Sequence, residues 1–172
     1  RRLAERGLAH RLSTAAAVLR QPDTRNRQAL RDLRAEGPAP IEGWLRLAAL
    51  EHSSPRQDID ALRQASAATT RVLLLVALLD DALPDSLARA AVADTLDDMA
   101  AILHAGGYPW DVQLPELRID DAPAAPALAA LRHTLAHFAQ ACDIEQPPPP
   151  DPDPPTGFFV PDAFRSPTHV RF

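Results

Sequence analysis

The chain has 172 residues and a formal net charge of −5 at pH 7, and 46% of its residues are apolar although only 5% are aromatic. This length suits one domain with a core of ordinary size, and the negative charge argues against a domain that binds nucleic acid. A single cysteine, Cys142, excludes an internal disulfide. The longest apolar run, residues 72–79, is far shorter than the roughly 20 residues that span a bilayer, so no membrane-spanning segment is expected.

The first helix is expected over about residues 3–20, because apolar residues recur there at helical spacing. Pro22 breaks this pattern, and either Asp23 or Thr24 can cap a short second helix that ends near Gly37. The apolar stripe of the first helix consists of Leu8, Leu12, Ala15 and Leu19, and the second helix is expected to turn Leu30 and Leu33 inward.

A third helix is expected over residues 41–52, with Trp44 as a core anchor. The longest helix follows from Ser54, which we expect to act as its cap, and Pro55, which suits the first turn, to about Leu79. Its second half is apolar all round and is expected to be buried on several sides. The inward residues are expected to be Leu45, Ala48 and Ala49 in the third helix and Ile59, Leu62, Ser66, Thr69, Leu73 and Val76 in the longest one.

The fifth helix is expected over residues 85–104, ended by Gly106 and Gly107, with Asp85 and Arg89 paired at i,i+4. The last helix is expected over residues 124–143. The inward stripe of the fifth helix is Ala88, Val92, Thr95, Met99 and Ile102, and a heptad seam on the last consists of Leu128, Leu131, Leu135, Phe138 and Cys142. The fold class is therefore all-α, an antiparallel bundle of about five or six helices.

The composition divides the chain into three parts. Residues 1–146 form the helical bundle domain, and residues 147–157 form a proline-rich spacer that favours the stiff polyproline II conformation. Residues 158–172 form an extended tail, which contains three phenylalanines before Arg165. These side chains are apolar enough that we expect the tail to pack against the bundle or against a membrane-proximal surface.

Two groups of residues have the spacing of metal ligands. Asp94, Asp97 and Asp98 share the outward face of the fifth helix, where Ala93 is also expected to be exposed. Clustered carboxylates can bind Mg²⁺, but we interpret these three as a solvated face paired with arginines, because like charges on one helix face repel. His133 and His137 lie one turn apart, a spacing found in zinc sites, but no third ligand flanks them and we expect both to be exposed.

The sequence shows neither a nucleophile beside a general base nor a glycine-rich phosphate loop. Cys142 lies on the apolar seam without a basic neighbour that would lower its pKa, so it is interpreted as a core residue. The six glycines leave little room for a phosphate-binding loop. We therefore expect no catalytic, cofactor-binding or metal-binding residues and no enzymatic activity.

Basic residues are concentrated at the start of the chain, where residues 1–20 contain five arginines and one glutamate. Residues 156–172 also have a small excess of arginine, whereas the region between is acidic. Basic residues beside membrane helices are retained on the cytoplasmic side. If both ends adjoin membrane segments, the pattern favours a cytoplasmic domain; the alternative is one basic helix face and a nearly neutral tail.

The tail contains a distinctive set of residues: Phe158, Phe159, Pro161, Asp162, Ala163, Phe164 and Pro167, followed by His169, Val170, Arg171 and Phe172. In these residues the tail resembles the segment that leads into the second membrane half of transporters in the fusaric acid resistance (FUSC), or aromatic acid exporter, family. The start of the second helix, residues 24–27, is a weaker point of likeness.

This resemblance implies a soluble cytoplasmic domain between the two membrane halves of a bacterial inner-membrane efflux transporter for aromatic carboxylic acids or related drugs. The domain would assemble protomers or gate the pore. The implied partners are the membrane portion of the same transporter, further copies of the chain and, as in some family members, a periplasmic adaptor protein. The alternative is a freestanding dimerisation or regulatory module that uses the seam of the last helix; an Asp-rich helical enzyme is a third reading.

Overall fold

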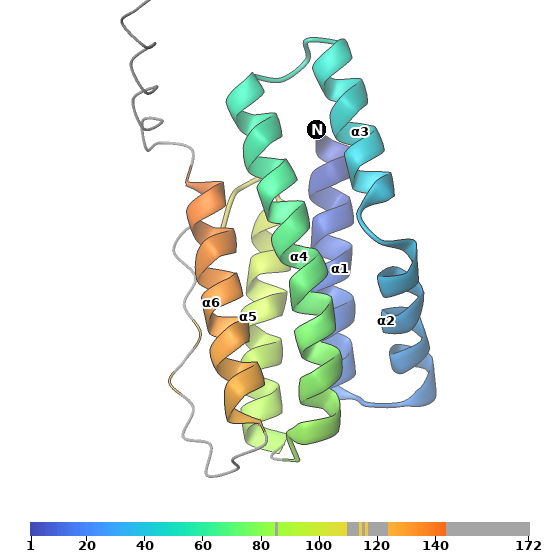
Figure 1. Ribbon diagram of the computed structural model, residues 1–172, viewed down its shortest axis with the longest axis vertical. Helices are drawn as coiled ribbons and strands as arrows, with labels where there is room; N and C mark the ends of the chain where they lie inside the picture. Colours follow the sequence, from blue (N-terminus) through green and yellow to red (C-terminus); the bar gives the residue numbers. More distant parts are fainter. Residues whose placement is uncertain (85, 110–113, 115, 117–123, 144–172) are drawn as a thin grey trace, which may run out of the picture.

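A computed structural model of the protein describes residues 1–84, 86–109, 114, 116 and 124–143. These residues form six α-helices and contain no strand (Figure 1). The expected all-α bundle is thereby confirmed, whereas the spacer and the tail lie outside the described residues. The helices are α1 (Arg2–Arg20), α2 (Thr24–Glu36), α3 (Ala39–Leu50), α4 (Arg56–Ala82), α5 (Ser86–His104) and α6 (Ala125–Cys142).

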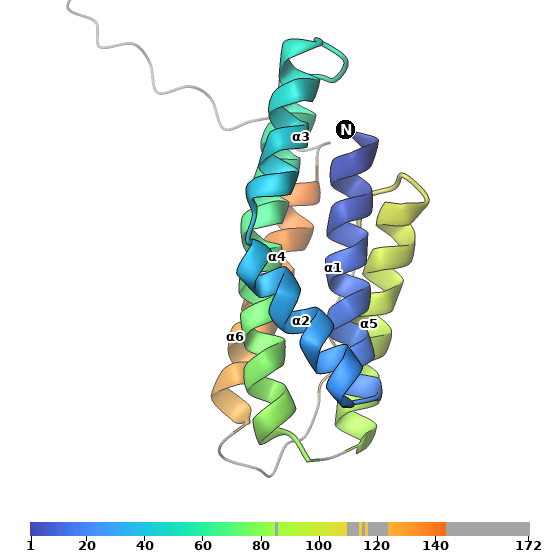
Figure 2. The same ribbon diagram turned by 90° about the vertical axis from the view of Figure 1, so that its right-hand side faces the viewer.

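Helices α1 and α4 lie side by side and run in the same direction (Figures 1 and 2). Helix α5 packs antiparallel along α1, and α6 packs antiparallel along α4. Helices α2 and α3 follow one another along the other side of the α1–α4 pair and contact both of its members. The bundle is therefore built from antiparallel pairs, but α1 and α4 are parallel, and so are α5 and α6.

One continuous apolar core fills the bundle. Every expected inward residue of α1 and of the α6 seam is at most 5% exposed, because each stripe faces a neighbouring helix. The six residues expected to face inward on α4 are buried as well. The seam of α6 lies within the bundle, where α6 packs along α4, so it is not the open dimerisation surface that the alternative function would need.

Helix α3 approaches α1 closely at Gly7. A Cβ atom on this residue would lie only 2.8 Å from Cζ3 of Trp44 and 3.3 Å from Cγ1 of Ile41. Trp44 is partly buried and packs against the core, which confirms its expected role as an anchor. The absence of a side chain at Gly7 thus allows the indole ring to pack directly on α1.

The helix ends largely follow the expected signals. Asp23 caps α2, since its carboxylate accepts a hydrogen bond of 2.7 Å from the backbone N–H of Asn26. Helix α5 ends in a Schellman motif: Gly106 has a φ of 87°, and the Gly107 N–H donates to the Ile102 carbonyl at 2.9 Å. Ser54 does not cap α4, however. The cap position is occupied by Pro55, which has no side-chain acceptor.

Three expectations about burial were wrong. Ala49 is exposed because the inner arc of α3 is completed by Ala48. Ala93 is fully buried, because the buried face of α5 is broad enough to include residues 92, 93 and 96. Ile102 is only partly buried, and the neighbouring Leu103 occupies the core instead.

The second half of α4 is not enclosed on all sides. Leu74 and Leu78 are 45% and 50% exposed, because the neighbouring helices cover only the other faces. Within the described part of the chain, α4 is also the one helix long and apolar enough to cross a membrane by length and composition. More than half of that apolar window is buried in the bundle (56%), as expected of the core helix of a soluble protein, so this is weak evidence for a membrane span.

Candidate functional site

The three aspartates of α5 form a partly neutralised surface. Arg20, at the end of α1, forms ion pairs with both Asp94 and Asp97. Asp94 and Asp98 are exposed. The interpretation as an arginine-paired face is therefore confirmed, and across the described residues no three His, Cys, Asp or Glu side chains are grouped as a metal site requires.

The remaining sequence candidates lie where their spacing placed them. His133 and His137 are both exposed on α6, away from the buried seam. Cys142 is 2% exposed, and burial raises the pKa of its thiol to about 12, so the reactive thiolate is scarce at neutral pH. This confirms Cys142 as a core residue.

The structure says nothing about the family motif of the tail. Phe158, Phe159 and the other motif residues lie outside the described part of the chain, so the expected packing of the tail stays a prediction. The weaker point of likeness, residues 24–27, is described. Arg27 from this segment donates to the carboxylate of Asp80 on α4 at 2.8 Å.

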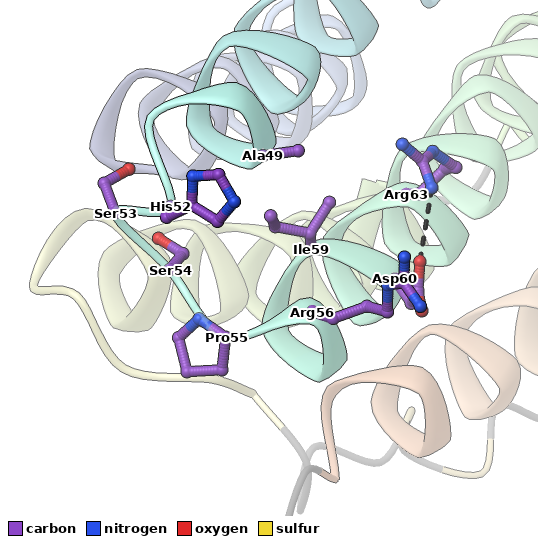
Figure 3. A pocket seen from close by; sticks show the side chains of 9 residues that line it. All are labelled: Ala49, His52, Ser53, Ser54, Pro55, Arg56, Ile59, Asp60 and Arg63. Carbon is purple, nitrogen blue, oxygen red and sulfur yellow. Dashed lines mark hydrogen bonds and ion pairs between the residues drawn. The ribbon is translucent and has the colours of Figure 1, made fainter. Parts of the chain in front are cut away.

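An open hollow of about 630 Å³ lies at the turn between α3 and α4 (Figure 3). Ala49 and Ile59 supply apolar side chains to it, and His52 lies between them and the two serines of the turn. The lining residues are Ala49, His52, Ser53, Ser54, Pro55, Arg56, Ile59, Asp60 and Arg63.

Local backbone geometry shapes this turn. His52 has a φ of 49°, in the left-handed region that few residues other than glycine adopt. Both the backbone N–H and the hydroxyl of Ser53 donate to the carbonyl of Ala48, each at 3.3 Å. The hydroxyl of Ser53 therefore satisfies the end of α3, as the unpaired carbonyls of a helix terminus require.

The hollow has binding chemistry but no arrangement for nucleophilic catalysis. Within the described residues, no hydrogen bond joins His52 to Ser53 or Ser54, as an activated serine would require. Arg63 donates to Glu42 at 3.3 Å and to Asp60 at 3.2 Å, as the dashed line to Asp60 in Figure 3 shows. Arg56 has no ion pair in this part of the structure. The guanidinium of Arg56, close to the apolar side chains of Ala49 and Ile59, suits a small organic anion.

A second hollow, of about 400 Å³, adjoins the first and shares Arg56 and Asp60 with it. It lies between the first turns of α4 and the end of α6, where Gln140 and Asp143 line it. Both hollows therefore lie at the end of the bundle where α4 begins and α6 ends.

The start of α1 is held at this same end by a buried glutamate. Glu5 is 1% exposed and accepts hydrogen bonds from Arg1 at 2.9 Å and from the Tyr108 hydroxyl at 3.3 Å. The Arg1 guanidinium lies 5.4 Å from the centre of the Tyr108 ring and also donates to Asp58, in the first turn of α4, at 2.5 Å. Burial raises the pKa of Tyr108, which keeps its hydroxyl a donor. In the sequence, Glu5 could be counted only as one charge in a basic segment.

At the other end of the bundle, a buried arginine joins the C-terminal ends of α1 and α4. Arg89 is 8% exposed and donates to the backbone carbonyls of Leu19 at 3.0 Å and Leu83 at 2.9 Å, among others. A cation at two helix C-termini satisfies carbonyls that have no partner within their own helices and interacts favourably with both dipoles. The expected partner of Arg89, Asp85, lies outside the described residues, and the carboxylate that Arg89 binds is that of Asp80.

No protein-family model matches the sequence, and no curated protein or solved structure matches it either.

Proposed function

We propose that the chain is the cytoplasmic domain of a bacterial inner-membrane efflux transporter for aromatic carboxylic acids or related drugs, with a role in assembly or gating. The structural observation that supports this proposal is that α1 begins and α6 ends at the same end of the bundle (Figure 1). Arg1 binds Asp58 in the first turn of α4, and Asp143 lines a hollow together with Arg56 of that turn. A domain inserted between two membrane halves needs both of its connections on one side.

The sequence of the tail supports the same proposal. Phe158 to Phe164 and the residues that follow resemble the segment that leads into the second membrane half of the FUSC family. In the sequence they follow α6, which ends at the same end of the bundle at which α1 begins. In this arrangement the hollow at the α3–α4 turn also lies on the membrane-proximal side, where the guanidinium of Arg56 can bind an organic carboxylate.

Export of aromatic acids tests the proposal directly. Cells in which the gene for the protein that contains this chain is deleted should become more sensitive to fusaric acid or hydroxybenzoic acid and should accumulate it. A plasmid copy should restore resistance, and sensitivity to a neutral toxic compound of similar size should not change. Unchanged sensitivity and unchanged accumulation across several aromatic acids would contradict the proposal.

The second candidate, a freestanding dimerisation or regulatory module, is favoured by one observation. Leu74 and Leu78 are half exposed on α4 and offer an apolar surface outside the core. Cell fractionation separates the two functions, because the transporter domain should be recovered with the inner membrane and the freestanding module with the soluble fraction.

A further inference from the structure

One face of α4 has a symmetric sequence of exposed residues. Arg71, Leu74, Leu78 and Asp81 follow one another at spacings of three, four and three, so they lie along one side of the helix. All four are exposed, and the two leucines retain about half of their surface in solvent (45% and 50%). We call these four residues the α4 stripe.

The charges at the two ends of the α4 stripe are not used within the bundle. Neither Arg71 nor Asp81 forms an ion pair among the described residues, in contrast to Asp80, which pairs with Arg27 and Arg89. The pKa of Arg27 is raised chiefly by its hydrogen bond to Asp80, and Asp81 adds only a longer-range attraction. Each end of the stripe therefore offers one charge to a partner.

The α4 stripe is complementary to itself when one copy is turned end over end. Arg71 and Asp81 are equally far from the midpoint between Leu74 and Leu78, so an antiparallel second copy places each Arg71 opposite an Asp81. The same operation places each Leu74 opposite a Leu78. A two-fold axis repeats every contact, which is the property of an isologous dimer interface.

A hollow beside the stripe offers a place for a side chain of the second copy. It has a volume of about 380 Å³ and lies between α4 and the end of α2, where Leu33, Leu73 and Leu74 give it apolar walls. Arg71 lines it as well. A leucine that enters such a hollow packs as a knob into a hole, in the manner of paired helices.

We propose that α4 is the surface through which two copies of this chain associate, antiparallel, with the α4 stripe at the centre of the contact. A lipid surface would favour charges of one sign, and the opposite charges at the two ends of the stripe do not fit that. The tail of the same chain contains Asp162, Arg165 and Arg171 around its phenylalanines. The order of these charges and apolar residues is not complementary to that of the stripe. A second copy is the occupant that satisfies both leucines and both charges.

This inference goes beyond the proposed function and does not depend on it, because a transporter domain and a freestanding module can both form such a dimer. The first experiment measures the mass of the purified chain by sedimentation across a range of concentrations. We expect a dimer that dissociates on dilution. Leu74→Gln/Leu78→Gln should be monomeric, with helix content and melting temperature close to those of the parent, since glutamine is a good helix former.

A matched control comes from a pair of exposed leucines on another helix. Leu47 and Leu50 on α3 are 56% and 75% exposed, at least as much as the pair on α4. Leu47→Gln/Leu50→Gln removes the same amount of apolar side chain and should leave the dimer unchanged. If both double variants weaken the dimer equally, or if neither does, the α4 stripe is not the interface.

Charge reversal tests the antiparallel geometry itself. Arg71→Asp places two like charges opposite each other at each end of the stripe, and so does Asp81→Arg, so each single variant should dimerise about tenfold more weakly or worse. An equal mixture of the two should form a heterodimer, because every charge then faces its opposite. Arg71→Asp/Asp81→Arg in one chain should likewise restore the homodimer.

Three further results would overturn the proposal. The first is a parent chain that stays monomeric at every concentration, and the second is a mixture of the two charge variants that remains monomeric. The third is a dimer that appears only after residues 144–172 are removed, which would mean that the tail occupies the stripe in the whole chain. None of these results bears on export of aromatic acids, so failure of the dimer and failure of the proposed function are distinguishable.

Discussion

The carboxylate of Asp80 accepts a hydrogen bond of 2.6 Å from Arg89 and, on its other oxygen, one of 2.8 Å from Arg27. Asp80 lies near the end of α4, Arg89 in α5 and Arg27 in α2, so one side chain joins three helices. Because Arg89 also binds carbonyls at the end of α1, this cluster closes the end of the bundle opposite the hollows. No motif in the sequence indicates this cluster.

Replacing Asp80 should destabilise the protein in a pH-dependent way. Burial alone would raise the pKa of Asp80, but the hydrogen bonds from Arg27 and Arg89 outweigh this effect and lower it. A lowered pKa in the folded state stabilises the protein above the ordinary carboxyl pKa, and the stability is lost as the pH falls through the lowered value. Asp80→Asn should therefore cost about 2 kcal/mol at neutral pH.

The measurement is urea unfolding of the parent and of Asp80→Asn from neutral to strongly acidic pH. The difference between their free energies of unfolding should shrink as the pH falls below the usual carboxyl range. Asp98→Asn is the matched control, because Asp98 is exposed on α5 and has no ion pair among the described residues. A pH-independent difference would show that the charge of Asp80 does not contribute.

Two glycines should respond in opposite directions to the same substitution. Gly7→Ala places a Cβ atom 2.8 Å from Trp44, and the ring must move to accommodate it. We expect a net loss of about 1 kcal/mol, since overpacking outweighs the gain in helix propensity. Gly43 has no atom within 4 Å of a new Cβ, so Gly43→Ala should stabilise the protein by about 0.5–1 kcal/mol. Thermal unfolding of both variants checks this; equal shifts would refute the close α1–α3 packing.

Much of this fold could be predicted because helical periodicity reports burial directly. The stripes of α1, α4 and α6 were correct in every residue, and the glycine and aspartate signals placed the ends of α2 and α5. The expectations that failed depend on how neighbouring helices pack in space, which the sequence pattern does not specify. Ala93 is buried because the face of α5 that packs in the core is broader than one stripe of residues. Ser54 does not cap α4 because the helix begins one residue later, with Pro55 at the cap position.

The site was less predictable than the fold. The sequence supplied candidates that are one turn apart on the same helix, such as His133 and His137, and the structure leaves those two exposed. The hollow at the α3–α4 turn combines side chains from both helices, and the Arg89 cluster depends on backbone carbonyls of two helices far apart in sequence. Contacts between residues on different helices cannot be predicted from the spacing of residues along the sequence.

The cytoplasmic placement can be tested by cysteine labelling at Ala101. This residue is exposed on α5, whereas Ala93 is buried and would give no signal. The native Cys142 should not interfere, since it is buried and its raised pKa keeps it a thiol. In the full-length protein, Ala101→Cys should resist a membrane-impermeant maleimide in intact cells and react after permeabilisation. Reaction in intact cells would place the domain on the other side of the membrane.

If the domain also captures the exported substrate, the hollow at the α3–α4 turn should bind an aromatic carboxylate. Arg56 has no ion pair among the described residues, so its guanidinium can bind the carboxylate, while the ring can lie against Ile59. Titration with 4-hydroxybenzoate should shift the methyl resonances of Ile59 and leave those of Ile41, which packs against α1, unchanged.

Arg56→Gln should weaken this binding by roughly two- to fivefold, the range expected for one exposed ion pair, and should raise the apparent KM for export without lowering the maximal rate. Arg25→Gln is the control, because Arg25 is an exposed arginine at the start of α2 and lines none of the three hollows. Capture of substrate by the hollow is excluded if Ile59 does not respond at millimolar ligand, or if both arginine variants behave alike. Export that persists unchanged in Arg56→Gln would then leave the domain a role in assembly or gating alone.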